Sequence, residues 1–111
     1  MTKESRSNIR FSVSIPVMLR FYERENLEGW GVIYDVSLGG LLIETLFPMH
    51  DRELVYLSFT LGNDYEFADV LGIAAHVSSR NGYCVAGVKF GTAKYKTQLR
   101  DGLYNILKLE K

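Results

Sequence analysis

The feature that most constrains the fold of this sequence is a two-residue alternation of apolar and polar side chains between Ser12 and Phe90. Successive side chains of a β-strand point to opposite faces of the sheet, so this period predicts strands that bury one face. Turn-forming residues interrupt the alternation and divide it into short segments. The sequence therefore predicts an all-β domain built from consecutive strands.

The first two segments are joined by a polar run, Arg24–Gly29, which is typical of a hairpin loop. In the first segment Pro16 predicts an edge strand or a bulge, because proline cannot donate to a ladder. One face of the first segment is expected to hold Val13, Ile15, Val17, Leu19 and Phe21. The second segment is expected to place Trp30, Val32, Tyr34 and Val36 on one face, and Ile33, Asp35 and Ser37 on the other.

Four further segments complete the pattern. The run Leu38-Gly39-Gly40 is expected to turn the chain, Gly72 indicates the bend of a barrel corner, and Asn81-Gly82 is a strong hairpin signal. The expected strands are Leu41–Thr45, Leu54–Leu61, Tyr65–Ser79 and Tyr83–Phe90.

After Gly91 the apolar residues follow a helical period. Gly102 costs such a helix about 1 kcal/mol, so we expect the helix to pack on the strands. The stripe that would face them consists of Tyr95, Leu99, Leu103, Ile106 and Leu107.

The predicted fold is a six-stranded antiparallel β-barrel with a C-terminal α-helix, because closure removes exposed strand edges. A β-sandwich is the alternative. We expect one domain over residues 1–111, with a flexible N-terminus over about 1–11, the barrel over about 12–91 and the helix over about 94–109.

Charge and composition exclude several classes of protein. Thirteen basic residues balance thirteen acidic ones, so the chain has no overall attraction to nucleic acid or to an anionic membrane. Cys84 is the single cysteine and is expected to be a small buried residue. The N-terminus lacks the apolar core of a signal peptide, and the apolar runs are too short to span a membrane. We expect a cytoplasmic chain with no membrane insertion, no metal and no cofactor.

The sequence also argues against an enzyme. His50 lies in a loop beside Asp51, and His76 falls in the middle of a strand, where we expect a structural histidine. Neither is spaced from a serine or cysteine as in a nucleophilic motif, and two separated histidines make a poor metal set. Phosphate-binding glycine loops and paired carboxylates do not occur.

Two arginines, Arg6 and Arg10, precede the first strand at a spacing of four. That spacing places both side chains on one face of an extended or helical segment. The guanidinium group forms paired hydrogen bonds with phosphate or with the guanine O6/N7 edge, and it stacks on purines. A second copy of this spacing, Arg20 and Arg24, has Glu23 inside it and is interpreted as a solvated strand exit.

A second polar cluster, Asp35, Ser37 and Gly40, follows the second predicted strand. The Asp35 carboxylate offers acceptors that match the N1–H and N2–H₂ donors of guanine, and the Ser37 hydroxyl can donate to a phosphate or to a carbonyl. Gly40 allows unusual backbone angles or a close approach. The same residue types also form ordinary turns with local hydrogen bonds.

Together these clusters resemble the PilZ domain family. R-x-x-x-R before a first strand matches Arg6 and Arg10, and the later D/N-x-S-x-x-G matches Asp35, Ser37 and Gly40. Glu4, Phe11 and the run Gly87-Val88-Lys89-Phe90 extend the similarity over nearly the whole chain.

The resemblance implies a barrel that binds cyclic di-GMP, a bacterial second messenger, through those five residues. Arg6 and Arg10 would clamp the ligand, Asp35 would recognise guanine, Ser37 would anchor it and Gly40 would shape the pocket. It further implies an adaptor that acts on an unidentified protein partner in motility, polysaccharide synthesis or virulence. A ligand-independent scaffold of the type IV pilus kind is the alternative, and a nucleic-acid-binding barrel fits poorly with a net charge of zero.

Overall fold

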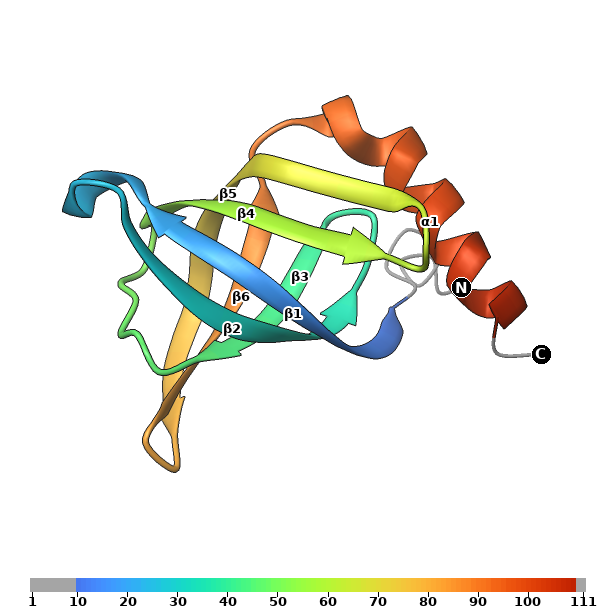
Figure 1. The fold of residues 1–111 in the computed structure, drawn as a ribbon. Helices are drawn as coiled ribbons and strands as arrows, with labels where there is room; N and C mark the ends of the chain where they lie inside the picture. The colour runs from blue at the N-terminus through green and yellow to red at the C-terminus, as the bar shows by residue number, and fades with distance from the viewer. Residues whose placement is uncertain (1–9, 110–111) are drawn as a thin grey trace, which may run out of the picture.

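The computed structural model describes residues 10–109 of the chain (Figure 1). Arg6 and most of the N-terminal stretch expected to be flexible lie outside the described residues. The strands are β1 (Phe11–Phe21), β2 (Leu27–Val36), β3 (Gly40–Thr45), β4 (Leu54–Leu61), β5 (Tyr65–Arg80) and β6 (Tyr83–Phe90), followed by the helix α1 (Lys96–Leu109).

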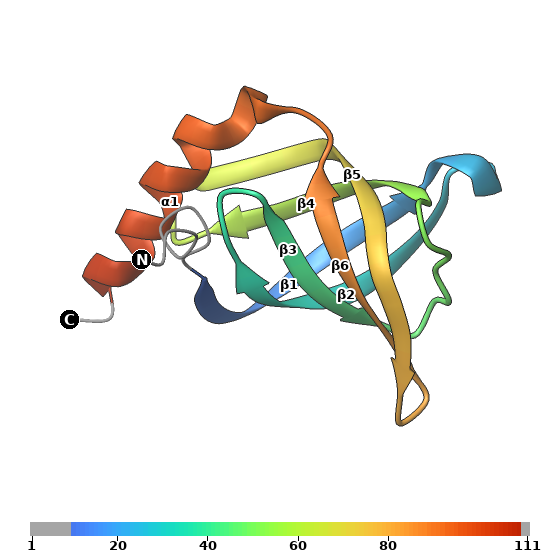
Figure 2. The same cartoon turned by 180° about the vertical axis from the view of Figure 1, so that it is seen from behind.

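The strands close into an antiparallel barrel in the order β1-β2-β3-β6-β5-β4 (Figures 1 and 2). The predicted six-stranded barrel with a C-terminal helix is confirmed, and the β-sandwich alternative is wrong. The predicted strand boundaries hold closely, except that β2 begins at Leu27, inside the expected hairpin loop. A short 3-10 turn, Tyr22–Arg24, and two residues with positive φ, Glu25 and Asn26, reverse the chain before it.

The barrel interior is filled by the side chains that the two-residue period assigned to a buried face. In β1 and β4 the alternation predicts the buried set, and Cys84 is buried as expected. The fully buried members from these two strands are Val17, Leu19, Phe21, Val55, Leu57 and Leu61.

The predicted face assignment of β2 is wrong because the strand carries a bulge. The pairing of β2 with β3 shifts register between Ile33 and Asp35, so one extra residue, Tyr34, enters the strand. A bulge changes which side chains face inward. Ile33 and Val36 are both fully buried, whereas Trp30 and Tyr34 are exposed.

Three special positions in the strands behave as predicted. Pro16 pairs with Val32 of β2 just after a register shift between Ser12 and Ile15, and it precedes the stretch paired with β4, Met18–Phe21. Gly72 pairs with both Val55 and Phe90, where β5 passes from β4 to β6. Asn81 and Gly82 both have positive φ, as a tight hairpin requires.

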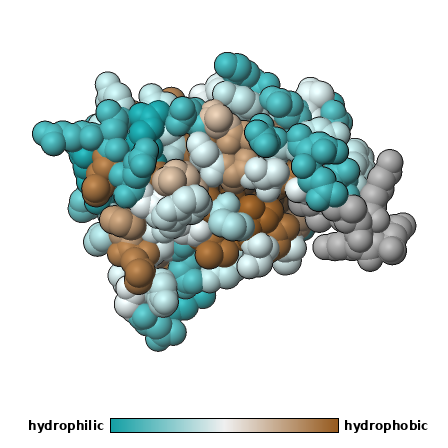
Figure 3. Space-filling view, in the orientation of Figure 1, coloured by the Kyte–Doolittle hydropathy of each residue, from teal (hydrophilic) through white to brown (hydrophobic). Residues whose placement is uncertain are grey.

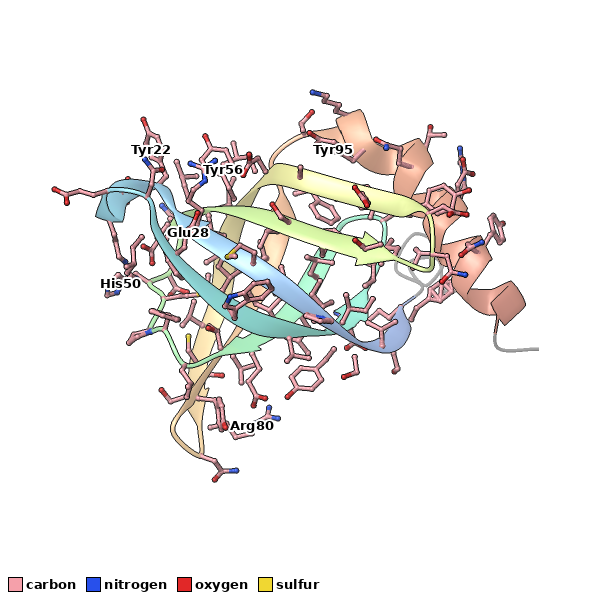
Figure 4. The ribbon with its side chains drawn as sticks, in the orientation of Figure 1. Tyr22, Glu28, His50, Tyr56, Arg80 and Tyr95 are labelled. Atoms are coloured by element: carbon pink, nitrogen blue, oxygen red, sulfur yellow. The ribbon has the colours of Figure 1, made fainter. Side chains whose placement is uncertain are left out.

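The helix α1 packs against β4 and β5 at one end of the barrel (Figure 1). Leu99 and Leu103 are buried, as the helical stripe predicted. A Cβ on Gly102 would lie 3.0 Å from Leu61 and 3.3 Å from Tyr65, so this glycine lets the helix approach the barrel closely. Tyr95, which ends the 3-10 turn Ala93–Tyr95 just before the helix, contacts Phe67 edge-on and is labelled in Figure 4.

Candidate functional site

A polar pocket of about 320 Å³ lies on the outer wall of the barrel, across β3, β5 and β6. Figure 2 shows this side of the molecule, with the loop between β2 and β3 at one end. Four of the five residues predicted to form a site line this pocket, and the fifth, Arg6, lies outside the described residues. These four are Arg10, Asp35, Ser37 and Gly40.

Arg10 and Asp35 come together at the rim of the pocket, although they are far apart in sequence. The guanidinium Nη1 of Arg10 lies 3.9 Å from Asp35 Oδ2, and the two side chains are 67% and 25% exposed. A long, exposed pair of this kind contributes little to stability. Both groups therefore remain available to another partner, Arg10 as a donor and Asp35 as an acceptor.

Ser37 organises the loop between β2 and β3. Its hydroxyl oxygen accepts hydrogen bonds from the N–H groups of Gly39 and Gly40, each at 3.3 Å. The Ser37 N–H in turn donates to the Gly40 carbonyl at 2.9 Å. The local hydrogen bonds expected of a turn residue are therefore present, and they hold the loop that carries Ser37 and Gly40 beside Asp35.

Gly40 is required by a close approach of β6. A Cβ at this position would lie 2.3 Å from the carbonyl oxygen of Val88, which belongs to the backbone of the paired strand. A side chain would therefore separate β3 from β6 at the pocket. The glycine of the motif thus has a packing reason that the sequence pattern alone does not show.

Sequence reasoning missed the part of the pocket formed by β5 and β6. Gly87 and Lys89 line it from β6, while Ala75 and His76 line it from β5. His76, expected to be a structural histidine in mid-strand, is exposed in the wall of the pocket. Its φ of 54° lies in the left-handed region, within a register shift between Ala75 and Ser78 that a sequence pattern does not reveal.

The interpretation of the second arginine pair as a solvated strand exit is also wrong for Arg24. Its guanidinium donates to both Glu53 oxygens, at 2.7 and 2.6 Å, and to the Pro48 carbonyl at 2.6 Å. Burial raises the pKa of Glu53, but hydrogen bonds from Arg24 and from the His50 N–H outweigh it, so the pKa is lowered overall. The hydrogen bonds of Arg24 with Glu53 and Pro48 join the loop between β3 and β4 to the β1–β2 hairpin.

A second cavity, of about 420 Å³, lies where β1 and β4 separate, and its lining includes Ile15, Met18, Trp30 and Phe67. Figure 3 shows apolar side chains gathered on this face of the molecule. Among its lining residues in the described chain, Glu66 carries the one formal charge. An acidic, apolar groove does not suit an anion, so the polar pocket is the candidate ligand site.

The fold and the site define a closed β-barrel that carries a mixed-charge pocket on its outer wall. The sequence matches the family model described as PilZ domain over residues 4–105. The chain therefore belongs to the PilZ domain family. Among the described residues no helix is long and apolar enough to cross a membrane.

Solved PilZ structures share the fold at low sequence identity. The PilZ domain of YcgR from Escherichia coli, solved with c-di-GMP, is 16% identical and has a TM-score of 0.69, with 97% of this chain and 92% of that chain covered. The PilZ domain of CeSA from a cellulose-synthesising bacterium is 19% identical with a TM-score of 0.60, covering 94% and 100%.

A third structure is longer than this chain. MrkH from K. pneumonia, in complex with c-di-GMP, is 16% identical with a TM-score of 0.73, and the match covers 99% of this chain but 57% of that chain. None of the curated proteins compared with the sequence matches it.

Proposed function

We propose that this protein is a non-catalytic receptor for cyclic di-GMP, which binds in the polar pocket. The observation that carries the proposal is the meeting of Arg10, Asp35, Ser37 and Gly40 in one pocket, although two separate sequence motifs supply them. The c-di-GMP complexes of YcgR and MrkH, which share the fold, support the choice of ligand.

The chemistry of the pocket suits a dinucleotide that carries two phosphodiester charges. Arg10 and Lys89 supply positive charge, and a guanidinium can form paired hydrogen bonds with phosphate or guanine. Asp35 supplies acceptors for the N1–H and N2–H₂ donors of guanine. The hydroxyl of Ser37, which donates to the Gly40 carbonyl at 3.3 Å, can turn toward a phosphate oxygen.

The pocket volume of about 320 Å³ is at the low end of the range for small-molecule sites. We propose that Arg6 and the residues around it complete the site over the ligand, because Arg6 precedes the pocket residue Arg10 by four positions. Ordering of a segment by a ligand is a common way to change a protein surface. The output of the receptor would then be an altered contact with a protein partner in the cytoplasm, in motility, polysaccharide or virulence control.

Selectivity between dinucleotides tests the proposal. Cyclic di-AMP has the same phosphates, but its adenines lack the N1–H and N2–H₂ donors that Asp35 would accept. A site built for hydrogen bonds rejects a ligand that leaves its polar groups unpaired. In calorimetric titration we expect cyclic di-GMP to bind at least a hundredfold more tightly than cyclic di-AMP, a ratio worth about 2.7 kcal/mol. Equal affinity for both would refute the role of Asp35.

A further inference from the structure

β5 contributes the imidazole of His76 to the wall of the pocket. This residue belongs neither to the R-x-x-x-R motif nor to the D/N-x-S-x-x-G motif. Ala74 is fully buried and Ala75 faces outward, so regular alternation would turn His76 back into the core. The bulge between Ala75 and Ser78 instead adds a residue, and Val77 takes the place against the core. His76 is thereby left exposed in the pocket wall.

The backbone on both sides of His76 is fixed by the loop between β3 and β4. The Arg52 N–H donates to the Ala74 carbonyl at 2.7 Å, and the Ala74 N–H donates to the Glu53 carbonyl at 2.9 Å. The Val77 N–H donates to Asp51 Oδ1 at 3.3 Å. Non-glycine residues in the left-handed region are uncommon, persist where the surrounding structure holds them, and gather at binding sites.

Charged groups of both signs surround this position. Arg10, Lys89 and Asp35 line the same pocket from the chain before β1, from β6 and from β2. Asp51 approaches from the β3–β4 loop through its bond to Val77. In that loop His50 and Arg52 are exposed and do not line the pocket. The formal charges of the three lining groups and Asp51 cancel, so a proton on the His76 ring would make the local balance positive.

We propose that His76 is a further ligand-contacting residue, and that protonation of its imidazole tightens the binding of an anionic dinucleotide in this pocket. The proposal rests on the proposed function, because it assumes that cyclic di-GMP occupies the pocket. Imidazole is the side chain whose charge ordinarily changes between pH 5 and 8. Phosphodiesters keep their negative charge over that range, so the change in electrostatic attraction comes from the protein.

The test is a calorimetric titration of the full chain with cyclic di-GMP at pH 5.5 and pH 8.0. The parent should bind roughly tenfold more tightly at pH 5.5, as one added charge-assisted contact implies. His76→Asn, which tolerates the left-handed backbone, should bind equally at both pH values and as weakly as the parent at pH 8.0. His76→Arg, with a permanent charge, should keep the tighter affinity at both.

His50→Gln is the matched control. His50 is the other histidine of the chain and lies at the end of the barrel that carries the β1–β2 hairpin (Figure 4). This variant should keep the full pH dependence of the parent. Parent binding with the same affinity at pH 5.5 and pH 8.0 would overturn the inference while leaving the receptor function intact. Equal weakening of His76→Asn at both pH values would also overturn it, and a parent without binding at either pH refutes the receptor function itself.

Discussion

At the scale of single residues, the two R-x-x-x-R pairs show what spacing can and cannot predict. The pattern is identical in both, yet Arg10 is largely exposed at a pocket, whereas Arg24 is paired with Glu53, whose side chain is 4% exposed. Sequence reasoning distinguished the pairs by their surroundings, but it could not see Glu53 approach Arg24 from a loop that follows much later in the chain. A buried partner is a property of the folded chain.

The Arg24–Glu53 pair should therefore dominate the stability of the β1–β2 end of the barrel. Arg24→Met keeps the apolar stem but leaves a buried carboxylate unpaired, which costs about 3 kcal/mol. Arg20→Met is the matched control, because its partner Asp69 lies 3.1 Å away on an exposed side chain, and exposed pairs contribute at most about 1 kcal/mol. Urea unfolding at pH 7 measures both, and equal losses would contradict the account.

Acid should remove the difference in stability between the parent and Arg24→Met. The pKa of Glu53 is lowered in the folded protein, so the pair stabilises the fold fully above the ordinary value of 4.5, and its contribution is lost as the pH falls through the lowered pKa. Without Arg24, burial raises the pKa of Glu53 in the variant, so we expect the gap between the parent and Arg24→Met to be widest near pH 7 and to narrow steadily as the pH falls toward and below 4.5. Unfolding curves at several pH values measure this gap.

At the scale of elements, the two-residue period predicted nearly every strand, and the misplaced side chains lie at bulges. The extra residue in β2 moved Val36 to the inner face, and the one in β5 moved His76 to the outer face. Both bulges border the pocket. The two-residue period of a sequence predicts only the regular part of a strand. The position of a bulge depends on how neighbouring strands pair, so the irregular residues that shape this site could not be predicted.

The turn between β2 and β3 gives an element-scale prediction. Gly40→Ala places a methyl group 2.3 Å from the Val88 carbonyl oxygen, so β3 and β6 must separate, at a cost of about 1–3 kcal/mol. Gly39→Ala is the neighbouring control, because a Cβ there meets no atom within 4 Å and surface changes usually stay within about 0.5 kcal/mol. Thermal melting compares the two variants.

Loss of ligand affinity should accompany the loss of stability in Gly40→Ala, since the separated strands carry the pocket. If Gly40→Ala melts like the parent, the close approach of β6 is not the reason for this glycine.

At the scale of the whole molecule, the sequence predicted the barrel, the helix and the membership of the PilZ family, because each depends on patterns repeated along the chain. Four of the five predicted site residues line one pocket, as the motifs implied. The remaining wall, Ala75, His76, Gly87 and Lys89, belongs to strands far along the chain. None of these four residues belongs to the two predicted site motifs, and closure of the barrel brings them to the site.

The central claim is that Arg10 belongs to a cyclic di-GMP site, and a titration of matched arginine variants tests it most directly. Arg100 is the control, because it lies exposed on α1, outside the lining of the pocket, and alanine is favourable in a helix. Arg24 cannot serve as the control, since its loss should destabilise the fold.

Arg10 and Arg100 are both exposed, so Arg10→Ala and Arg100→Ala should melt like the parent. In calorimetric titration with cyclic di-GMP, Arg10→Ala should lose about ten- to a thousandfold in affinity, because each charge-assisted contact contributes about 1.5–3 kcal/mol. Arg100→Ala should bind like the parent. Parental affinity in Arg10→Ala would contradict the placement of the site, and a parent that does not bind at high micromolar ligand would favour the ligand-independent scaffold instead.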